Sequence, residues 1–407
     1  MYIKRERYMN KIRPFYEVDL IKVLTGVRRS GKSVLLTQIE EELLSQGIKE
    51  EQIIKINFED VAFEKIRTVN RLDTHIKKAI KTKDKYYIFL DEIQHVRNFE
   101  RVLSSLRATV NCSIFVTGSN SKLLSGKLAT LLVGRCIEFR IMPFSFQEAY
   151  EFNILLGKDI MPDTFIYDYM SWGGLPLRYS FDREKDILAY LRQTYEGIVD
   201  KDIVTEKSKI SRQNFTKVAG YVMANAGKYF SGKNIETYFE SENKELLDKK
   251  TVYRYLDKME KACLINRVKR FDIAGKKTMA YVEKQYAVDT GFRIVNTNQV
   301  DFEDTFFLEN IIYNELISRG YEVYVGKTYK GEVDFVVIEG RRKCFVQVTY
   351  LLSGEETIRR EFDAFKPIKD AAPKYVLSLD RADFSRDGIA HINIVDFLLG
   401  DKDISLN

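Results

Sequence analysis

The sequence predicts an α/β protein built on a mostly parallel sheet, followed by a helical segment and a second mixed α/β part. Two observations carry this prediction. Over the first 150 residues, short apolar runs alternate with helical segments, as they do in βαβ units. From about residue 143 the pattern becomes helical, and the last hundred residues return to strands mixed with helices. At 407 residues the chain is long enough for two or three domains.

The first part holds five apolar runs of the length that strands require. Each run is rich in Ile, Val, Phe and Tyr, as strands covered on both faces are. The expected strands are Ile21–Thr25, Ile53–Phe58, Tyr86–Leu90, Cys112–Thr117 and Cys136–Ile141, with helices such as Lys32–Ser45 and Asn98–Val110 between them. We therefore expect a first domain over residues 1–142, followed by segments 143–210, 211–300 and 301–407.

A phosphate-binding motif follows the first expected strand. The stretch GVRRSGKS at residues 26–33 fits the pattern G-x-x-x-x-G-K-[ST] in full, between a strand and a helix. Its glycines let backbone N–H groups wrap a β- or γ-phosphate, its lysine neutralises the phosphate oxygens, and its last serine offers a hydroxyl to Mg²⁺. A charged surface turn is the alternative interpretation, and the flanking strand and helix argue against it. The residues expected to bind the nucleotide are Gly26, Val27, Arg28, Arg29, Ser30, Gly31, Lys32, Ser33 and Val34, with Ser33 at the metal.

Two acids follow the third expected strand, in the stretch YYIFLDE. Asp91 can hold the Mg²⁺ shell, and Glu92 can polarise the water that attacks the γ-phosphate. The next strand, SIFVT, also ends in polar residues, among which Asn120, with Ser119 and Thr117 close behind, is predicted to lie near the γ-phosphate. Solvated acids and a capped turn are the simpler alternatives. No N-K-x-D follows a strand of this domain, so ATP is expected rather than GTP.

Taken together, GVRRSGKS, FLDE, VTGSN and LVGRCIEFRIMPFSFQEAY resemble the AAA+ ATPases, and more narrowly the prokaryotic AAA-type ATPases with an uncharacterised C-terminal domain. The resemblance covers essentially the whole chain. It implies ATP and Mg²⁺ as cofactors, a helical lid over residues 143–210 and a homo-oligomer as one arrangement. It also implies that Arg135 is an arginine finger, acting on a neighbouring subunit or in cis, and that Arg178 approaches the phosphates as a second sensor. An arginine paired with an acid is the alternative for Arg135.

Residues 211–300 are predicted to form a winged helix. Val252, Leu256, Met259 and Cys263 recur at helical spacing and should face the core. The outward residues and the hairpin tip are basic or aromatic, which favours contact with double-stranded DNA. The residues expected at the DNA are Lys249, Lys250, Tyr253, Arg254, Lys276 and Lys277. Winged helices also bind proteins, and basic runs are often simply solvated, so a protein partner stays open.

Residues 301–407 resemble the restriction-endonuclease-like PD-(D/E)xK fold. The residues that match its metal-binding positions are Glu309, Asp334 and Gln347. Thr349 stands where that fold has a lysine, and glutamine is a poorer metal ligand than glutamate. Lys366 or Lys369 could supply the missing cation from elsewhere in the sequence. We expect a degenerate site without nuclease activity, in a structural or DNA-recognising module.

Composition narrows the remaining choices. No run of eighteen apolar residues occurs, so no membrane span is expected, and the N-terminus lacks the apolar region of a signal peptide. The four cysteines lie far apart, which is typical of a reducing compartment and argues against a disulfide framework or a zinc site. The net charge of +6 permits nucleic-acid contact. We expect a cytoplasmic, ATP-dependent switch or motor that acts on DNA. A scaffold switch that binds a protein and an ATP-gated nuclease are the alternatives.

Overall fold

The computed structural model of the chain describes residues 1–118, 134–205, 208, 210–230, 237, 247–297 and 304–407. These residues form two compact units, Met1–Met142 and Pro143–Asn407. The first unit has the bounds of the expected first domain, and the second contains the three segments expected after it. Across the described residues, no helix is both long and apolar enough to cross a membrane.

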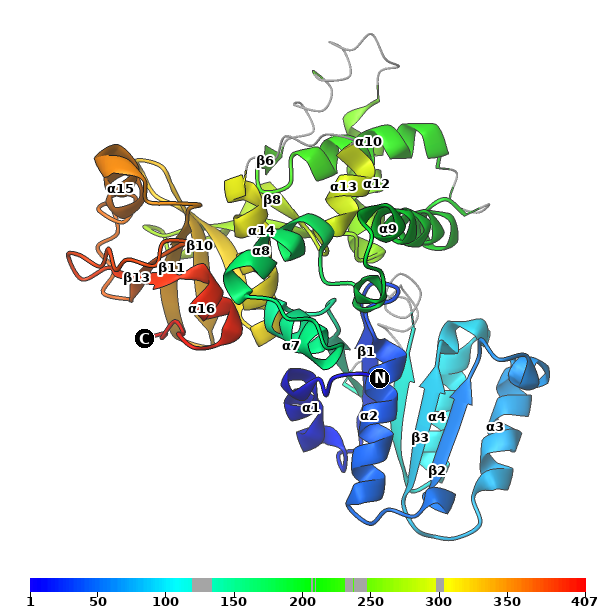
Figure 1. The fold of residues 1–407 in the computed structure, drawn as a ribbon. Helices are drawn as coiled ribbons and strands as arrows, with labels where there is room; N and C mark the ends of the chain where they lie inside the picture. Colours follow the sequence, from blue (N-terminus) through cyan, green and yellow to red (C-terminus); the bar gives the residue numbers. More distant parts are fainter. Residues whose placement is uncertain (119–133, 206–207, 209, 231–236, 238–246, 298–303) are drawn as a thin grey trace. The chain divides into compact units, whose positions relative to one another are not determined.

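The first unit is a parallel sheet with helices on both faces (Figure 1). Its strands are β1 (Ile21–Thr25), β2 (Ile53–Asn57), β3 (Tyr86–Asp91), β4 (Cys112–Thr117) and β5 (Cys136–Arg140), in the order β2-β3-β4-β1-β5. The sequence predicted all five to within one residue at each end. Because every pair is parallel, the carboxyl ends share one edge of the sheet, and the loops after β1, β3 and β4 leave from that edge.

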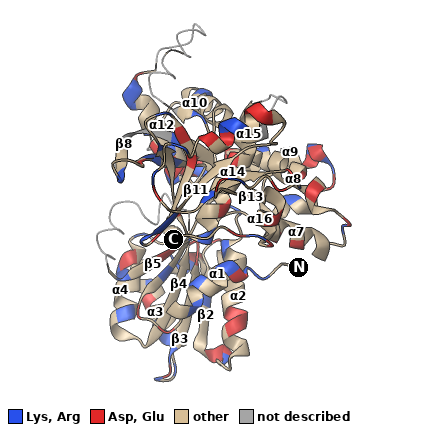
Figure 2. Ribbon diagram, turned by 90° about the vertical axis from the view of Figure 1, so that its left-hand side faces the viewer, with Lys and Arg blue, Asp and Glu red and all other residues tan. Residues whose placement is uncertain are grey.

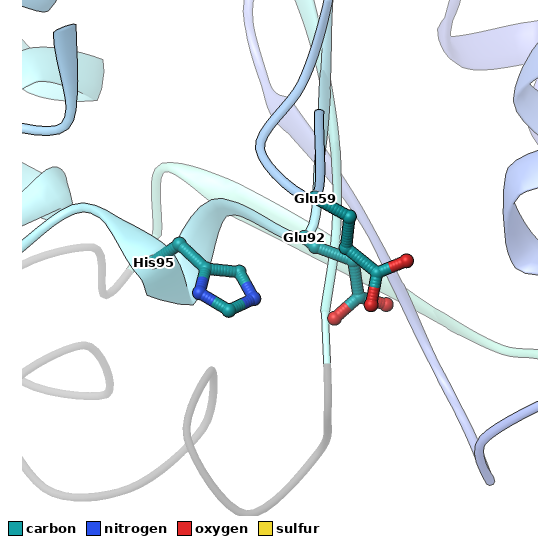
Figure 3. Close-up of side chains that lie close together, drawn as sticks. All are labelled: Glu59, Glu92 and His95. Atoms are coloured by element: carbon teal, nitrogen blue, oxygen red, sulfur yellow. The ribbon is translucent and has the colours of Figure 1, made fainter. Parts of the chain in front are cut away.

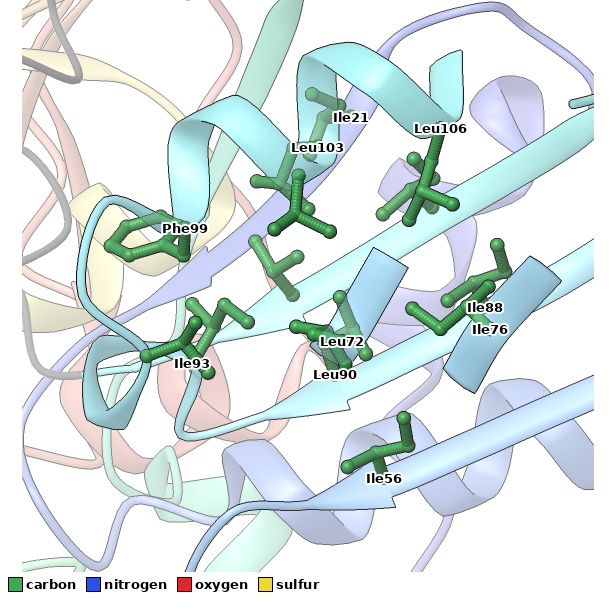
Figure 4. Close-up of a cluster of buried hydrophobic side chains, with 14 of the residues drawn as sticks. Ile21, Ile56, Leu72, Ile76, Ile88, Leu90, Ile93, Phe99, Leu103 and Leu106 are labelled. Carbon is green, nitrogen blue, oxygen red and sulfur yellow. The ribbon is translucent and has the colours of Figure 1, made fainter. Parts of the chain in front are cut away.

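Each face of this sheet has its own hydrophobic core. Helices α1 (Glu6–Ile12) and α2 (Lys32–Ser45) cover one face, and α3 (Val69–Ala79) and α4 (Phe99–Thr109) cover the other. Successive strand residues point to opposite faces, so Val23 packs in the α3/α4 core, shown in Figure 4, while Leu24 packs in the α1/α2 core. The short helices η1 (Arg13–Phe15), η2 (Glu50–Gln52), η3 (Val61–Ile66) and η4 (Ile93–His95) complete the unit.

The second unit begins with the helices α7 (Phe146–Leu155), α8 (Pro162–Trp172), η5 (Pro176–Ser180), α9 (Glu184–Ile198) and η6 (Val199–Ile203). A capping box starts α7. The Ser145 hydroxyl accepts the Glu148 N–H at 3.2 Å, and the Glu148 carboxylate accepts the Ser145 N–H at 2.9 Å. This arrangement satisfies two backbone donors that a helix start would otherwise leave without partners.

The glycine turn after α8 encloses a buried carboxylate. The Gly174 N–H donates to Asp289 Oδ2 at 2.8 Å, and the Gly291 N–H donates to Oδ1 at 2.9 Å. A Cβ on Gly173, whose φ is 74°, would lie 1.9 Å from the same carboxylate. The stretch WGGLP therefore uses glycine because its backbone approaches Asp289 so closely. Burial raises the pKa of Asp289 to about 6, against the effect of these N–H donors and of Arg178.

The rest of the second unit is organised around one mixed sheet. Its elements are α10 (Arg212–Ala224), β6 (Tyr229–Phe230), α12 (Lys249–Lys261), β7 (Ile265–Asp272), β8 (Lys277–Ala287), α13 (Gly291–Thr297), α14 (Asp304–Arg319), β9 (Glu322–Lys327), β10 (Glu332–Glu339), β11 (Arg342–Val348), α15 (Gly354–Asp363), β12 (Lys374–Ser378), β13 (Ala390–Asn393) and α16 (Ile394–Leu399). The strand order is β13-β12-β11-β10-β9-β7-β8-β6. The hairpin β7–β8 was expected in the winged helix. Its parallel pairing with β9 makes it continuous with the strands expected in the last domain, so a boundary near residue 300 would divide this sheet.

Candidate nucleotide site and other candidate residues

The loop after β1 has the backbone of a phosphate-binding loop. Gly26, Arg29 and Gly31 have φ of 136°, 67° and 92°. A Cβ on Gly26 would lie only 2.1 Å from the carbonyl oxygen of Ile141, so a side chain at this position would force the two backbones apart. Helix α2 begins at Lys32, directly after Gly31, which directs the positive end of its dipole toward the loop. Positive φ at Arg29, which is not a glycine, indicates that the surroundings impose this conformation.

Two polar side chains of this loop are buried. Lys32 is 5% exposed, and its Nζ donates to the carbonyl oxygens of Gly26 at 3.2 Å and Val27 at 2.9 Å. Ser30 is fully buried, and its hydroxyl has no hydrogen-bond partner within the described part of the chain. Buried polar atoms normally have partners, so this hydroxyl and the nearby ammonium fit a loop that encloses a polar group such as a phosphate. Ser33 is exposed in the first turn of α2, where its hydroxyl could reach a metal ion.

A buried arginine from the N-terminal segment supports this loop. Arg5 is 2% exposed, and its guanidinium donates to the carbonyl oxygen of Ser30 at 2.9 Å and to that of Met142 at 3.1 Å. Its backbone N–H donates to the side chain of Gln38 on α2 at 3.0 Å. Arg5 therefore links the phosphate-binding loop to the last residue of the first unit. Sequence analysis missed it, because its guanidinium binds backbone carbonyls far along the chain, which no side-chain pattern marks.

Thr117 connects the two acids at the end of β3. Its hydroxyl donates a hydrogen bond to Asp91 Oδ1 and accepts the Glu92 N–H at 3.0 Å. Thr117 is fully buried and Asp91 is 6% exposed, so these bonds are shielded from water. The strands β3 and β4 are parallel neighbours, which brings their ends together. Sequence analysis ranked Thr117 behind Asn120 and Ser119, which both lie outside the described residues.

Two further side chains approach Glu92. One ligand atom from each of Glu59, Glu92 and His95 lies within 4.8 Å of the others, and Figure 3 shows the His95 ring facing the two carboxylates. Gln94 also donates to the Glu92 carboxylate through its amide. Two carboxylates and an imidazole could hold a divalent cation here. For the position of Glu59 the sequence holds a weak indication, because Glu59 follows β2 and β2 pairs with β3.

Comparison with known proteins assigns two parts of the chain to families. The AAA domain family matches residues 19–150, and a domain family of unknown function, DUF8612, matches residues 164–300. An uncharacterized protein of Haemophilus influenzae is 33% identical over 401 residues, which cover 98% of each chain. The uncharacterized protein MJ1544 of Methanocaldococcus jannaschii is 31% identical over 365 residues, 86% of this chain and 79% of that protein. The chain therefore belongs to the same family as these two proteins, and its first unit contains an AAA domain. Among solved structures, the Walker-type ATPase PABY2304 of Pyrococcus abyssi is similar at 14% identity and a TM-score of 0.49, over 72% of this chain and 95% of that one.

The AAA domain of this P-loop ATPase has arginines at both edges of its sheet. Arg135 is exposed and precedes β5, and its carbonyl oxygen accepts the Ile21 N–H at 2.9 Å. Arg135 therefore lies at the amino ends of the strands. The P-loop lies at their carboxyl ends, roughly 16 Å away over the five residues of β1 at about 3.3 Å per residue. An in-cis role does not fit this placement, and the role toward a neighbouring subunit stays a prediction. Arg140, which sequence analysis missed, pairs with Thr25 at the P-loop edge, and two buried nitrogens of its guanidinium lack partners among the described residues.

Arg178 is engaged within the second unit. It is 2% exposed, and its guanidinium donates to the Gly173 carbonyl at 2.7 Å and to the Asp168 carboxylate at 2.8 Å. It also lies 3.9 Å from the centre of the Tyr179 ring. A guanidinium with these partners stabilises the glycine turn, so the geometry gives no support to the second-sensor prediction.

Helix α12 has the faces that its sequence predicted. The residues expected in the core, Val252, Leu256, Met259 and Cys263, are all buried. Of the residues expected at DNA, Tyr253 is half-buried and the others are exposed: Lys249, Lys250, Arg254, Lys276 and Lys277. Arg267 on β7 forms an ion pair with Asp257 of α12. Exposed positive charge thus lies in the first turns of α12 and at the hairpin turn, and Lys261 at the end of α12 and Lys269 on β7 are exposed as well.

The residues expected at a degenerate nuclease site do come together. Glu309 and Asp334 both approach Lys284, at 2.8 and 3.9 Å, and the Asp334 N–H donates to the Gln347 side chain at 3.2 Å. The cation in this cluster is thus Lys284 of β8, which sequence analysis missed. The two lysines considered as substitutes are not part of this cluster: the Lys366 side chain is 74% exposed and pairs with Asp363, and Lys369 is also exposed.

Proposed function

We propose that this AAA-type ATPase binds Mg-ATP at the P-loop and hydrolyses it with Glu92 as the general base. The observation that best supports the proposal is the hydroxyl of Thr117, which binds both Asp91 and the Glu92 N–H. It does so from β4, the strand between β3 and the strand that leads into the P-loop. In this proposal the metal-binding acid Asp91, the base Glu92 and the phosphate-binding loop share one edge of the sheet.

Each group has a distinct task in phosphoryl transfer. The P-loop N–H groups and Lys32 stabilise the charge that develops on the phosphate oxygens. Ser33 and Asp91 would hold Mg²⁺, which neutralises the β- and γ-phosphate oxygens when bound. Glu92 orients the attacking water and accepts its proton. An exposed Arg135 is available to a neighbouring subunit, where it would stabilise the transition state in trans.

Two variants separate binding from turnover. Glu92→Gln keeps the size and polarity of the side chain but removes the base, so it should bind ATP normally and turn over at least about a hundredfold more slowly. Lys32→Ala should lose ATP binding together with turnover. Steady-state hydrolysis and nucleotide binding are measured for both variants, and unimpaired hydrolysis in either contradicts these roles.

We further propose that α12 and the β7–β8 hairpin form a winged helix that contacts double-stranded DNA. The support comes from charge and exposure: Lys249, Lys250 and Arg254 are exposed in the first half of α12, and Lys276 and Lys277 are exposed at the hairpin turn. Lys and Arg residues of these elements are blue in Figure 2. A basic helix beside a basic hairpin suits the major groove and its flanking phosphates.

A charge-matched pair of variants tests DNA contact. Replacing Lys249 and Lys250 with Ala should weaken duplex binding and reduce the slope of log affinity against log salt by about 2. Replacing the exposed Lys65 and Lys78 of the first unit changes the net charge equally and should leave DNA affinity unchanged. Fluorescence anisotropy measures both. Equal effects of the two pairs, or no duplex binding at all, would favour a protein partner instead.

A further inference from the structure

A buried cluster of ionisable groups lies at the curled part of the second unit's sheet. The ammonium of Lys284 on β8 lies 2.8 Å from Glu309 of α14, 3.0 Å from Glu332 and 3.9 Å from Asp334, both of β10. The strands β8 and β10 are separated in the sheet by β7 and β9, so the sheet must curl for these side chains to meet. The exposed fractions of the Lys284, Glu309 and Asp334 residues are 4%, 3% and 8%.

Hydrogen bonds hold two of the three carboxylates, those of Glu309 and Asp334, in place. The hydroxyl of Tyr286 donates to the same oxygen of Glu309 that Lys284 approaches, and the Val348 N–H donates to Asp334 Oδ2 at 2.8 Å. These donors leave Asp334 Oδ1 and Glu332 Oε1 directed at the ammonium. One oxygen from each of the three carboxylates therefore lies 2.8–3.9 Å from the Lys284 nitrogen.

The cluster contains more acids than bases. Three carboxylates face one ammonium, and the next cation, the guanidinium of Arg270, lies 3.8 Å from Glu332 Oε2. Burial raises the pKa of Glu332 to about 7. Burial and the nearby Glu309 carboxylate raise the pKa of Asp334 well above its usual range, against the effect of Lys284.

We propose that the ammonium of Lys284 occupies the cation position of a carboxylate site that would otherwise hold a divalent metal ion. Hard divalent ions such as Mn²⁺ and Ca²⁺ prefer several oxygen ligands around one point, which is the arrangement that these three carboxylates give to the ammonium. A lysine that activates a metal-bound water has to lie beside the metal. Here the carboxylates surround the lysine nitrogen itself, so the native chain is closed to metal at this site. The inference does not depend on the proposed ATPase mechanism.

The test is Mn²⁺ binding to the full-length, nucleotide-free protein, measured by calorimetry and by the loss of the free-Mn²⁺ electron paramagnetic resonance signal. Wild type and Asp334→Asn should bind the same number of Mn²⁺ ions. Lys284→Met should bind one more ion than wild type, lose it when Asp334→Asn is added, and melt at a higher temperature with Mn²⁺ than without it. Lys343→Met is the matched control: within the described residues Lys343 forms an ion pair with one acid, Asp370, so its loss should create no Mn²⁺ site.

Two results contradict the proposal. One is Mn²⁺ binding, or Mn²⁺-dependent cleavage of duplex DNA, by the wild type that Asp334→Asn abolishes. The other is a folded Lys284→Met variant that gains no Mn²⁺. Removing the ammonium leaves buried acids without a partner and can prevent folding. The double variant Lys284→Met/Glu309→Gln removes one charge of each sign and keeps two carboxylates, and it should also gain one Mn²⁺ ion. The comparison of wild type with Asp334→Asn tests the proposal without any substitution of Lys284.

Discussion

Replacing Thr117 with valine tests the geometry of the proposed active site. Valine has nearly the same shape but no hydroxyl, so the substitution removes a hydrogen bond to Asp91 and another from the Glu92 N–H. A hydrogen bond to a charged group contributes about 1.5–3 kcal/mol, and a neutral one about 1 kcal/mol. Thr117→Val should therefore lower the free energy of unfolding by about 3 kcal/mol. If half or more of this energy positions the two acids in the transition state, kcat falls by roughly 10- to 100-fold.

Thr117→Ser is the matched control, because serine keeps the hydroxyl and loses only a methyl group. Steady-state ATP hydrolysis at saturating Mg-ATP gives kcat, and chemical denaturation gives the free energy of unfolding. We expect Ser to retain most of the wild-type kcat and Val to lose it, with a smaller change in nucleotide affinity. Wild-type turnover in Thr117→Val would refute the idea that the hydroxyl organises the two acids.

Three further predictions concern the support of the site and of the glycine turn. Gly26→Ala should lower the free energy of unfolding by at least about 2 kcal/mol, because its Cβ would meet the Ile141 carbonyl. Gly47 also has positive φ, but its Cβ would lie more than 4 Å from every described atom beyond its chain neighbours, so Gly47→Ala separates the clash from backbone strain in the same denaturation assay. Arg5→Met should weaken Mg-ATP affinity by about tenfold in a binding titration, since it removes buried charge-assisted bonds behind the P-loop, and unchanged affinity would contradict that role. The pKa of Asp289, about 6, exceeds the value near 3.8 that it has when unfolded. The folded state then binds the proton more tightly, so the free energy of unfolding should fall by about 2 kcal/mol as pH rises from 4 to 6, and Asp289→Asn should remove that slope in denaturation curves.

The first unit could be predicted from sequence because its signals are local. Each strand is a short apolar run, and the glycines of the P-loop lie between a strand and a helix, so periodicity and motif spacing suffice. Asp91 and Glu92 follow from the same logic, since they end a buried strand. The pairing of both acids with Thr117 depends on strand order, which the pattern of one strand does not contain.

The missed residues act through long-range contacts. Arg5 binds backbone carbonyls 25 and 137 positions away. Lys284 belongs to a hairpin that its sequence assigns to a separate domain, and only the parallel pairing of β7 with β9 brings it to Glu309 and Asp334. Lys366 and Lys369 follow the nuclease-like motif closely in the sequence, but both are exposed. The cation of the cluster comes from β8 instead.

Isothermal titration of the purified protein with Mg-ATP tests the central claim most directly. Enclosure of the triphosphate by the loop at residues 26–33 predicts heat of binding with a stoichiometry near one per chain, and the loss of that heat in Lys32→Ala. Equal heats from the wild type and Lys32→Ala, or none from either, would contradict the assignment of this loop as the nucleotide site.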